Sequence, residues 1–421
     1  MTDLLAQPRE YGAEGDERDA SRRAMDVLSR LLAHRGQPAA EINAILADHP
    51  QSVFVHCVRM TIIVRDDDRT ATEALAASIA AITAAGSGAS EGAQRHGAAA
   101  TLWLTQSPAV ALDAYAAIVA FQPYDVLALA VAHALDFRLG NRAALRDRVA
   151  TAIAVWNESM LFHAEILAMY AFGLEENGAY RYAETVARRA LALKPHLLAA
   201  IHVIAHVMEM QRRPREGLDF LAAHEAAWTA GNGFAIHLAW HRALFHLQLG
   251  DAAGALAVYD AQIAPPSSPN SLSPNLAALA DASALLWRLN LRNVDLGGRW
   301  QPLADRWGSA TLADARPFFI VHAMMAFAAA GRTARAARLL AALRSVDVDD
   351  TAQTLPEDAL ALPVSEALLA FAAHDYVGSL AFLERVRHIA DRCGGSLAQC
   401  DILQLTVVEA TARARHGQMA A

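Results

Sequence analysis

Hydrophobic positions between residues 194 and 249 recur with the period of an α-helix. Ile201, Ile204, Ala205 and Met208 are spaced three or four residues apart or lie side by side, so one side of this segment is apolar at about 3.6 residues per turn. No stretch of the chain alternates between apolar and polar residues for long enough to predict a strand. The sequence therefore predicts an all-α protein.

Histidine and glutamate side chains interrupt this apolar pattern at helical spacing. His202, His206 and Glu209 occupy positions i, i+4 and i+7, which stacks them on one face of a helix. His237 and His241 repeat the four-residue step further along the chain. The separation of the two pairs is close to the length of a tetratricopeptide repeat, about 34 residues, so the pattern indicates a repeat architecture.

The segment immediately before the histidines follows the second half of such a repeat. Gly178 and Tyr180 lie at an inter-helix turn, Ala183 lies where two helices would cross closely, and Pro195 ends the second helix. Small residues are needed where helices approach, and proline ends a helix. The following units, found by stepping along the chain, match less closely: 198–231, 236–263, 317–344 and 360–388.

The predicted organisation is a single α-solenoid of helical hairpins over residues 21–421. A solenoid grows by adding repeats, so the length of the chain does not require division into domains. Residues 1–20 are rich in acidic residues and are expected to form a disordered lead-in, with neither a signal peptide nor a membrane anchor. Prolines interrupt the repeats after residue 264, and an inserted loop and helix is predicted at about 264–310 over one face of the solenoid.

Composition narrows the classes of partner and the compartment. The net charge is −8 and no basic patch stands out, which argues against nucleic acid as a partner. No uninterrupted apolar run approaches the roughly 20 residues of a membrane span, so no membrane partner is predicted. Cys57, Cys393 and Cys400 form no CxxC pattern, and a sparse, odd set of cysteines is typical of a reducing compartment. The predicted location is the cytoplasm.

Six motifs occur in an order that resembles the tetratricopeptide repeat protein 38 family. They are YAFGLEENGAYRYAE, HVIAHVMEMQRRPREG, WHRALFHLQLGD, LADASALLWRL, VHAMMAF and GGSLAQCDIL, and the resemblance covers about residues 100–410. It implies an α-solenoid of degenerate tetratricopeptide repeats and carries no biochemical role with it. The chain departs from the family pattern at residues 397–401 and at Leu238–Ala239. An activity that used these positions would be altered or lost here.

The repeat register places five histidines at positions that face the concave groove of tetratricopeptide domains. Lysine, arginine and asparagine, which hold a peptide carboxylate in such domains, are not at these positions, so that binding mode is not expected. Glutamate and tryptophan side chains accompany the histidines. The candidate ligand-binding or metal-binding residues are His202, His206, Glu209, His237, His241 and His322, with Trp240 and Glu165 on the groove wall.

Four interpretations of the histidines remain open. They are packing histidines of a helical core; a groove for a peptide, a protein or a small anionic molecule, since imidazole both donates and accepts hydrogen bonds; a divalent metal site; or a centre of acid–base catalysis. The sequence favours an interaction or small-ligand-binding protein. The alternatives are an enzyme at the same residues, metal-dependent or acid–base, and a purely structural scaffold; assembly of several copies stays open. Glu175–Glu176 is expected to be a solvated charge run.

Overall fold

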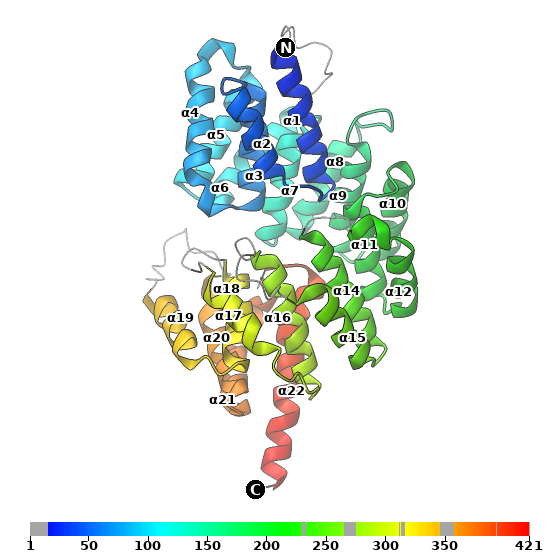
Figure 1. The fold of residues 1–421 in the computed structure, drawn as a ribbon, viewed down its shortest axis with the longest axis vertical. Helices are drawn as coiled ribbons and strands as arrows, with labels where there is room; N and C mark the ends of the chain where they lie inside the picture. The colour runs from blue at the N-terminus through cyan, green and yellow to red at the C-terminus, as the bar shows by residue number, and fades with distance from the viewer. Residues whose placement is uncertain are drawn as a thin grey trace. The chain divides into compact units, whose positions relative to one another are not determined.

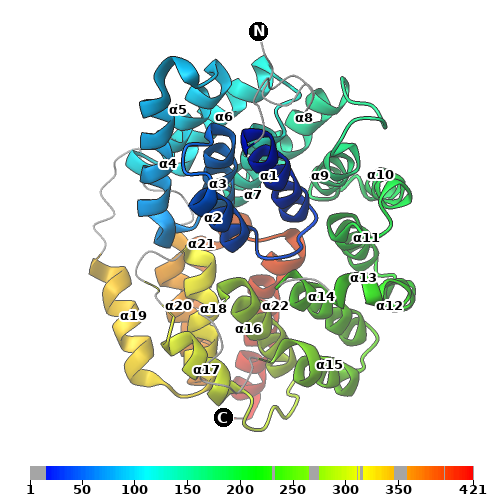
Figure 2. The same ribbon diagram turned by 45° about the horizontal axis from the view of Figure 1, so that its top comes forward.

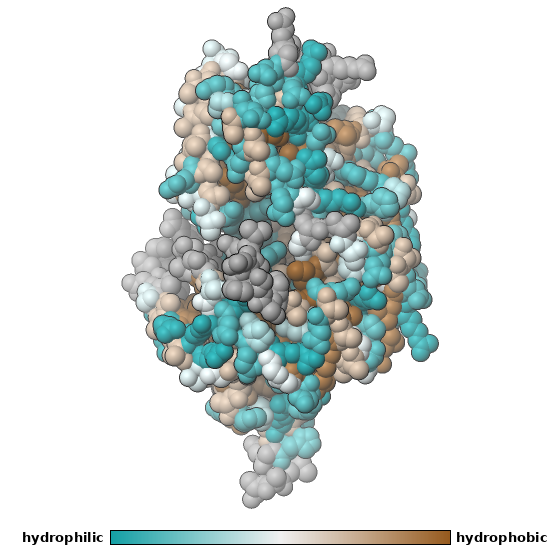
Figure 3. Space-filling view, in the orientation of Figure 1, coloured by the Kyte–Doolittle hydropathy of each residue, from teal (hydrophilic) through white to brown (hydrophobic). Residues whose placement is uncertain are grey.

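The computed structural model describes residues 16–229, 233–264, 275–310, 312, 316–345, 358–392 and 394–420. Within these ranges every regular element is a helix and there is no strand, so the predicted all-α, solenoid-like class is confirmed. Figure 1 shows the helices, labelled in chain order. None of the described helices is long and apolar enough to cross a membrane. On the face seen in Figure 3, hydrophilic and hydrophobic residues are interspersed.

The chain forms two compact units. Unit 1 consists of Met1–Val207 and His224–Asn232, and unit 2 consists of Met208–Ala223 and Gly233–Ala421. The boundary falls inside one helix, so His202 and His206 belong to unit 1 whereas Glu209 belongs to unit 2. The single solenoid predicted over residues 21–421 stays a prediction.

Unit 1 is a succession of helices in which neighbours along the chain pack against each other, as α8, α9 and α10 do in Figure 2. Short turns with glycine in the left-handed region separate several of them; Gly178 has φ 76°, a conformation that suits glycine best. Ala183 is fully buried, as the repeat pattern predicts. The helices are α1 (Asp16–Leu32), α2 (Pro38–Asp48), α3 (Val53–Asp66), α4 (Thr72–Ala85), α5 (Glu91–Thr105), α6 (Pro108–Phe121), α7 (Val126–Arg138), α8 (Arg142–Ile153), α9 (His163–Glu175), α10 (Tyr180–Leu193), most of α11 (Leu198–Met210) and α13 (Glu225–Thr229), with 3₁₀ turns at Arg69–Ala71 and Gly86–Gly88.

The first helix of unit 1 begins earlier than the sequence predicts. Helix α1 begins at Asp16, so the disordered lead-in predicted for residues 1–20 is wrong for residues 16–20, and residues 1–15 lie outside the described part. The acidic residues that suggested disorder stand in the first helical turn, where negative charge interacts favourably with the helix dipole. Ala20 and Ala24 are buried on the apolar face of α1. After this helix, Arg35 donates to the carbonyl oxygens of His196 and Ala227, each at 3.1 Å.

Unit 2 is built around α14 and α16. Helix α14 packs against α12, α15 and α16, and α16 packs against α17, α18 and α22. The remaining helices extend this arrangement as further pairs, α18 with α19 and α20, and α21 with α20 and α22. The helices are α12 (Pro214–Ala223), α14 (Phe234–Gln248), α15 (Ala252–Val258), α16 (Leu276–Leu291), α17 (Trp300–Gly308), α18 (Pro317–Ala329), α19 (Thr333–Ser345), α20 (Asp358–Ala372), α21 (Tyr376–Val386) and α22 (Leu397–Ala420), with a π-helical turn at Tyr259–Ile263 and a 3₁₀ stretch at Arg387–Arg392.

The helix predicted within the insertion at 264–310 exists, but it is not a cover over one face. Twelve of the sixteen residues of α16 are buried, and its neighbours lie on several sides. A helix that is apolar on most of its circumference is buried on most of it, which places α16 inside the core of unit 2. Ser283 on this helix accepts a hydrogen bond from Trp307 Nε1 at 2.9 Å. The proline-rich run at 265–274 lies outside the described residues.

Candidate functional site

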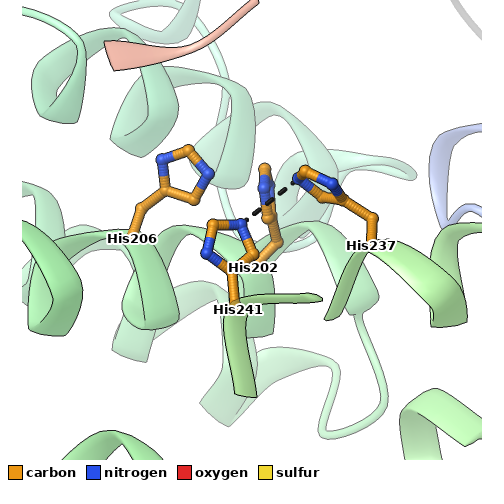
Figure 4. A group of neighbouring side chains, drawn as sticks. All are labelled: His202, His206, His237 and His241. Carbon is orange, nitrogen blue, oxygen red and sulfur yellow. Dashed lines mark hydrogen bonds between the residues drawn. The ribbon is translucent and has the colours of Figure 1, made fainter. Parts of the chain in front are cut away.

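Four side chains of unit 2 form a continuous hydrogen-bonded chain, called here the His–carboxylate chain: Glu209, His241, His237 and Asp281. His241 Nδ1 lies 2.6 Å from Glu209 Oε2, and His237 Nδ1 lies 2.9 Å from Asp281 Oδ2. The two imidazoles meet at their Nε2 atoms, 3.2 Å apart, as the dashed line in Figure 4 shows. The order is therefore carboxylate, imidazole, imidazole, carboxylate.

Three helices place these groups. His237 and His241 stand one turn apart on α14 and so point from the same face. Glu209 lies near the end of α11, and Asp281 lies on α16, which packs directly against α14. Glu209, His241 and Asp281 are buried, with His241 fully so, whereas the His237 side chain keeps 16% of its surface exposed. His237 is thus the most exposed of the four residues in the His–carboxylate chain.

The proton count of the His–carboxylate chain is unusual. A carboxylate oxygen accepts a hydrogen bond, so each imidazole facing one carries its proton on Nδ1. Two neutral imidazoles supply two protons, and both are used in this way. The Nε2 atoms of His237 and His241 then face each other as two lone pairs at 3.2 Å. The three contacts therefore need a third proton, or a metal cation in its place between the Nε2 atoms.

A second layer of contacts holds Asp281 in place. Asp281 Oδ1 accepts a hydrogen bond from Gln399 Nε2 at 3.2 Å, and Gln399 Oε1 accepts from the Ser396 backbone N–H at 3.1 Å. Sequence reasoning did not assign Asp281 or Gln399 to the site. The available signal was the GGSLAQCDIL motif, which contains Gln399. Residues 397–401, where the chain departs from the family pattern, thus include a residue that orients the site.

Trp240, predicted as groove wall, packs on the His–carboxylate chain. Its indole lies parallel to the His237 imidazole, with ring centroids 5.5 Å apart and an interplanar angle of 12°. The buried guanidinium of Arg288 lies 5.3 Å from the Trp240 ring and also donates to the Ala398 carbonyl oxygen at 3.0 Å. Contact with the Trp240 ring restricts the orientation of the His237 imidazole.

His322 is buried on α18 of unit 2. Its Nδ1 donates to the Phe318 carbonyl oxygen at 2.7 Å, and its Nε2 has no hydrogen-bond partner among the described residues. Burial lowers the pKa of His322 to about 4, and the charge of Arg288 acts in the same direction, while Asp281 opposes it. His322 is therefore a neutral imidazole near neutral pH. Among the described residues, His322 makes no hydrogen bond to a member of the His–carboxylate chain.

The two histidines of unit 1 lie together on α11. The rings of His202 and His206 are 4.2 Å apart, and Figure 4 draws both. His206 Nδ1 lies 3.2 Å from Glu175 Oε2. Glu175 and Glu176 are buried, so the solvated charge run expected at these positions is wrong. Adjacent glutamates are usually solvated, but here they stand at the end of α9, where it meets α8 and α11.

The predicted site residues are divided between the two units. The structure brings Glu209, His237 and His241 together and stacks Trp240 on them. Glu165 is buried and accepts from Lys194 Nζ at 2.5 Å in unit 1. His241 is fully buried, as is His206, so these two imidazoles do not line an open surface. A common groove for all the candidates stays a prediction.

No known protein-family model matches the chain. The resemblance to the tetratricopeptide repeat protein 38 family therefore stays an expectation drawn from the order of its motifs. The fold and the site define an all-α protein whose second unit contains a pair of imidazoles, one fully buried and one partly exposed, each backed by a carboxylate.

Proposed function

We propose that this protein is a metal-dependent enzyme whose unit 2 binds a divalent transition-metal ion through Nε2 of His237 and His241. The observation that carries the proposal is the meeting of the two Nε2 atoms while both Nδ1 atoms face carboxylates. A metal cation between the Nε2 atoms takes the place of the third proton, and imidazole nitrogen is a preferred ligand of zinc and similar ions.

The separation of the nitrogen atoms supports this proposal. Two nitrogen ligands at 2.0–2.1 Å from a tetrahedral ion are about 3.4 Å apart. The two Nε2 atoms are 3.2 Å apart, so His237 and His241 need to move by only a few tenths of an ångström at most. Side chains one helical turn apart are a common way to present two histidines to one ion.

The carboxylates support it further. Histidine ligands usually donate their second ring N–H to a carboxylate or a carbonyl, which fixes the tautomer and makes the ligating nitrogen more basic. Glu209 and Asp281 accept these bonds here. Two imidazoles leave the other coordination positions to further protein ligands and to water, and a divalent ion lowers the pKa of a bound water enough to make it a nucleophile near neutral pH.

The test is the metal content of the purified full-length chain. Metal would be measured by mass spectrometry after dialysis against zinc, for the wild type, the double variant His237→Ala/His241→Ala and the control His416→Ala. His416 is an exposed histidine of α22 bonded to its own helix. The proposal predicts that the double variant loses one equivalent and that the control retains it. Equal metal content in all three proteins would refute it.

A metal-free enzyme is the second candidate, and the same proton count supports it. An extra proton shared by the two Nε2 atoms would satisfy the His–carboxylate chain as well as a cation does. The His–carboxylate chain would then connect buried Glu209 to partly exposed His237 and serve general acid–base catalysis. A metal-free wild type that shows a strongly hydrogen-bonded imidazole proton by NMR, absent in His241→Ala, would favour this candidate over the metal site.

A further inference from the structure

A second cluster of potential metal ligands lies in unit 1, and it is separate in sequence from His237 and His241. Glu175 is the last residue of α9, Glu176 follows it, and His206 stands on α11. Each offers one ligand atom, and these atoms lie within 4.8 Å of one another. All three side chains are buried. The cluster thus joins the end of one helix to the middle of another.

One carboxylate oxygen in this cluster, Oε1 of Glu175, is buried and unsatisfied among the described residues. Glu176 has a cationic neighbour, because Arg142 Nε lies 3.5 Å from Glu176 Oε2. Glu175 is fully buried; its Oε2 faces His206 Nδ1, and its Oε1 has no hydrogen-bond partner among the described residues. A buried carboxylate oxygen without a partner is costly, because it loses its hydration and gains nothing in return.

The position on α9 increases that cost. The carbonyl groups at the C-terminal end of a helix present a negative partial charge, so carboxylates are unfavourable there. Tyr180, the first residue of α10, lies near the same charges: burial raises the pKa of its phenol, and Glu175 and Glu176 raise it further. Burial at the C-terminal end of α9 is therefore unfavourable for the Glu175 carboxylate unless a cation lies beside it.

We propose that Glu175, Glu176 and His206 bind a divalent cation. Glu175 Oε1 is the oxygen that would bind the ion, beside the contact that Oε2 makes with His206 Nδ1. Two carboxylates and one imidazole suit Mn²⁺ or Zn²⁺ better than Ca²⁺ or Mg²⁺, which prefer oxygen alone. Ligand atoms of a tetrahedral ion are about 3.4 Å apart, so the three ligand atoms, which lie within 4.8 Å of one another, would draw closer when the ion binds. The ion fastens α9 to α11.

This site and the one proposed in unit 2 can be distinguished by counting ions. Mn²⁺ and Zn²⁺ would each be titrated calorimetrically into the metal-stripped full chain. The variants are Glu175→Gln, Glu176→Gln, His237→Ala/His241→Ala and the control Glu184→Gln, a carboxylate of α10 that pairs with exposed Arg188. The wild type and the control are expected to bind two equivalents, and each of the other variants one. Glu175→Gln keeps the size of the side chain, and circular dichroism checks its folding.

Each outcome decides between the two sites. If Glu175→Gln and Glu176→Gln bind as many ions as the wild type, the unit 1 site is refuted, whatever His237→Ala/His241→Ala does. If only the histidine variant is unaffected, the unit 2 proposal fails and the unit 1 site stands. A single equivalent in the wild type, lost in all three test variants, would assign both groups to one ion and overturn the separate site. Should Glu175→Gln fail to fold, Glu176→Gln carries the test alone.

Discussion

Replacing Asp281 by asparagine should weaken metal binding at His237 without removing a ligand. Asp281 accepts two hydrogen bonds, from His237 Nδ1 at 2.9 Å and from Gln399 Nε2 at 3.2 Å. Asparagine has one oxygen and one NH₂ group, so in either orientation one of these donors faces another donor. The buried site then loses one hydrogen bond to a charged acceptor, worth about 1.5–3 kcal/mol.

The expected result is a 10–100-fold loss of zinc affinity, the range typical when the carboxylate behind a histidine ligand is changed. Affinity would be measured by competition with a chromophoric chelator, on the full chain at constant pH. Asp305→Asn serves as the control, because Asp305 is exposed and pairs with Arg332. An unchanged zinc affinity in Asp281→Asn, with the protein folded, would show that the carboxylate does not support a metal ligand.

Two further predictions concern stability. Gly173→Ala should destabilise unit 1 by about 1–3 kcal/mol through overpacking, because the new Cβ would lie 2.7 Å from the Arg146 Cα on α8. Urea denaturation would measure the loss, with Gly88→Ala as the control because the space around Gly88 is open. Equal midpoints for the two variants would contradict the close crossing of the helices. The pKa of His322 is 6.5 in the unfolded chain and about 4 in the folded protein. As the pH falls, the unfolded chain therefore takes up a proton at this position before the folded protein does. The free energy of unfolding is thus highest above about pH 6.5 and declines towards pH 4. Between pH 7 and pH 5 the wild type should lose about 2 kcal/mol of its free energy of unfolding through this group. His322→Gln should lose less over the same pH range in urea denaturation. An identical pH dependence of the two proteins would count against a buried neutral imidazole.

Much of the helical architecture can be predicted from the sequence because it depends on local patterns. The turn at Gly178 is marked by a glycine that takes φ 76°, and Ala183 is buried where the repeat pattern requires a small residue. The periodicity also places His237 and His241 on one face of a helix, as found. Such features involve residues close in sequence, so spacing alone specifies them.

The partners of the histidines could not be predicted in this way. Asp281 reaches His237 from 44 residues further along, on a helix whose apolar pattern extends around most of its surface and so does not reveal which neighbours it has. Periodicity assigns a residue to a face but not to the helix that packs there. The burial of Glu175 and Glu176 was missed for the same reason, since it depends on contacts with α8 and α11.

The most direct test of the proposed metal site is the X-ray absorption spectrum of the zinc-loaded protein. It would be recorded in the Glu175→Gln background, so that only the ion assigned to unit 2 remains. The account predicts imidazole nitrogen ligands at about 2.0–2.1 Å from zinc, and the loss of this signal when His237→Ala/His241→Ala is added. A spectrum without imidazole scattering, or one that the two histidine substitutions leave unchanged, would contradict it.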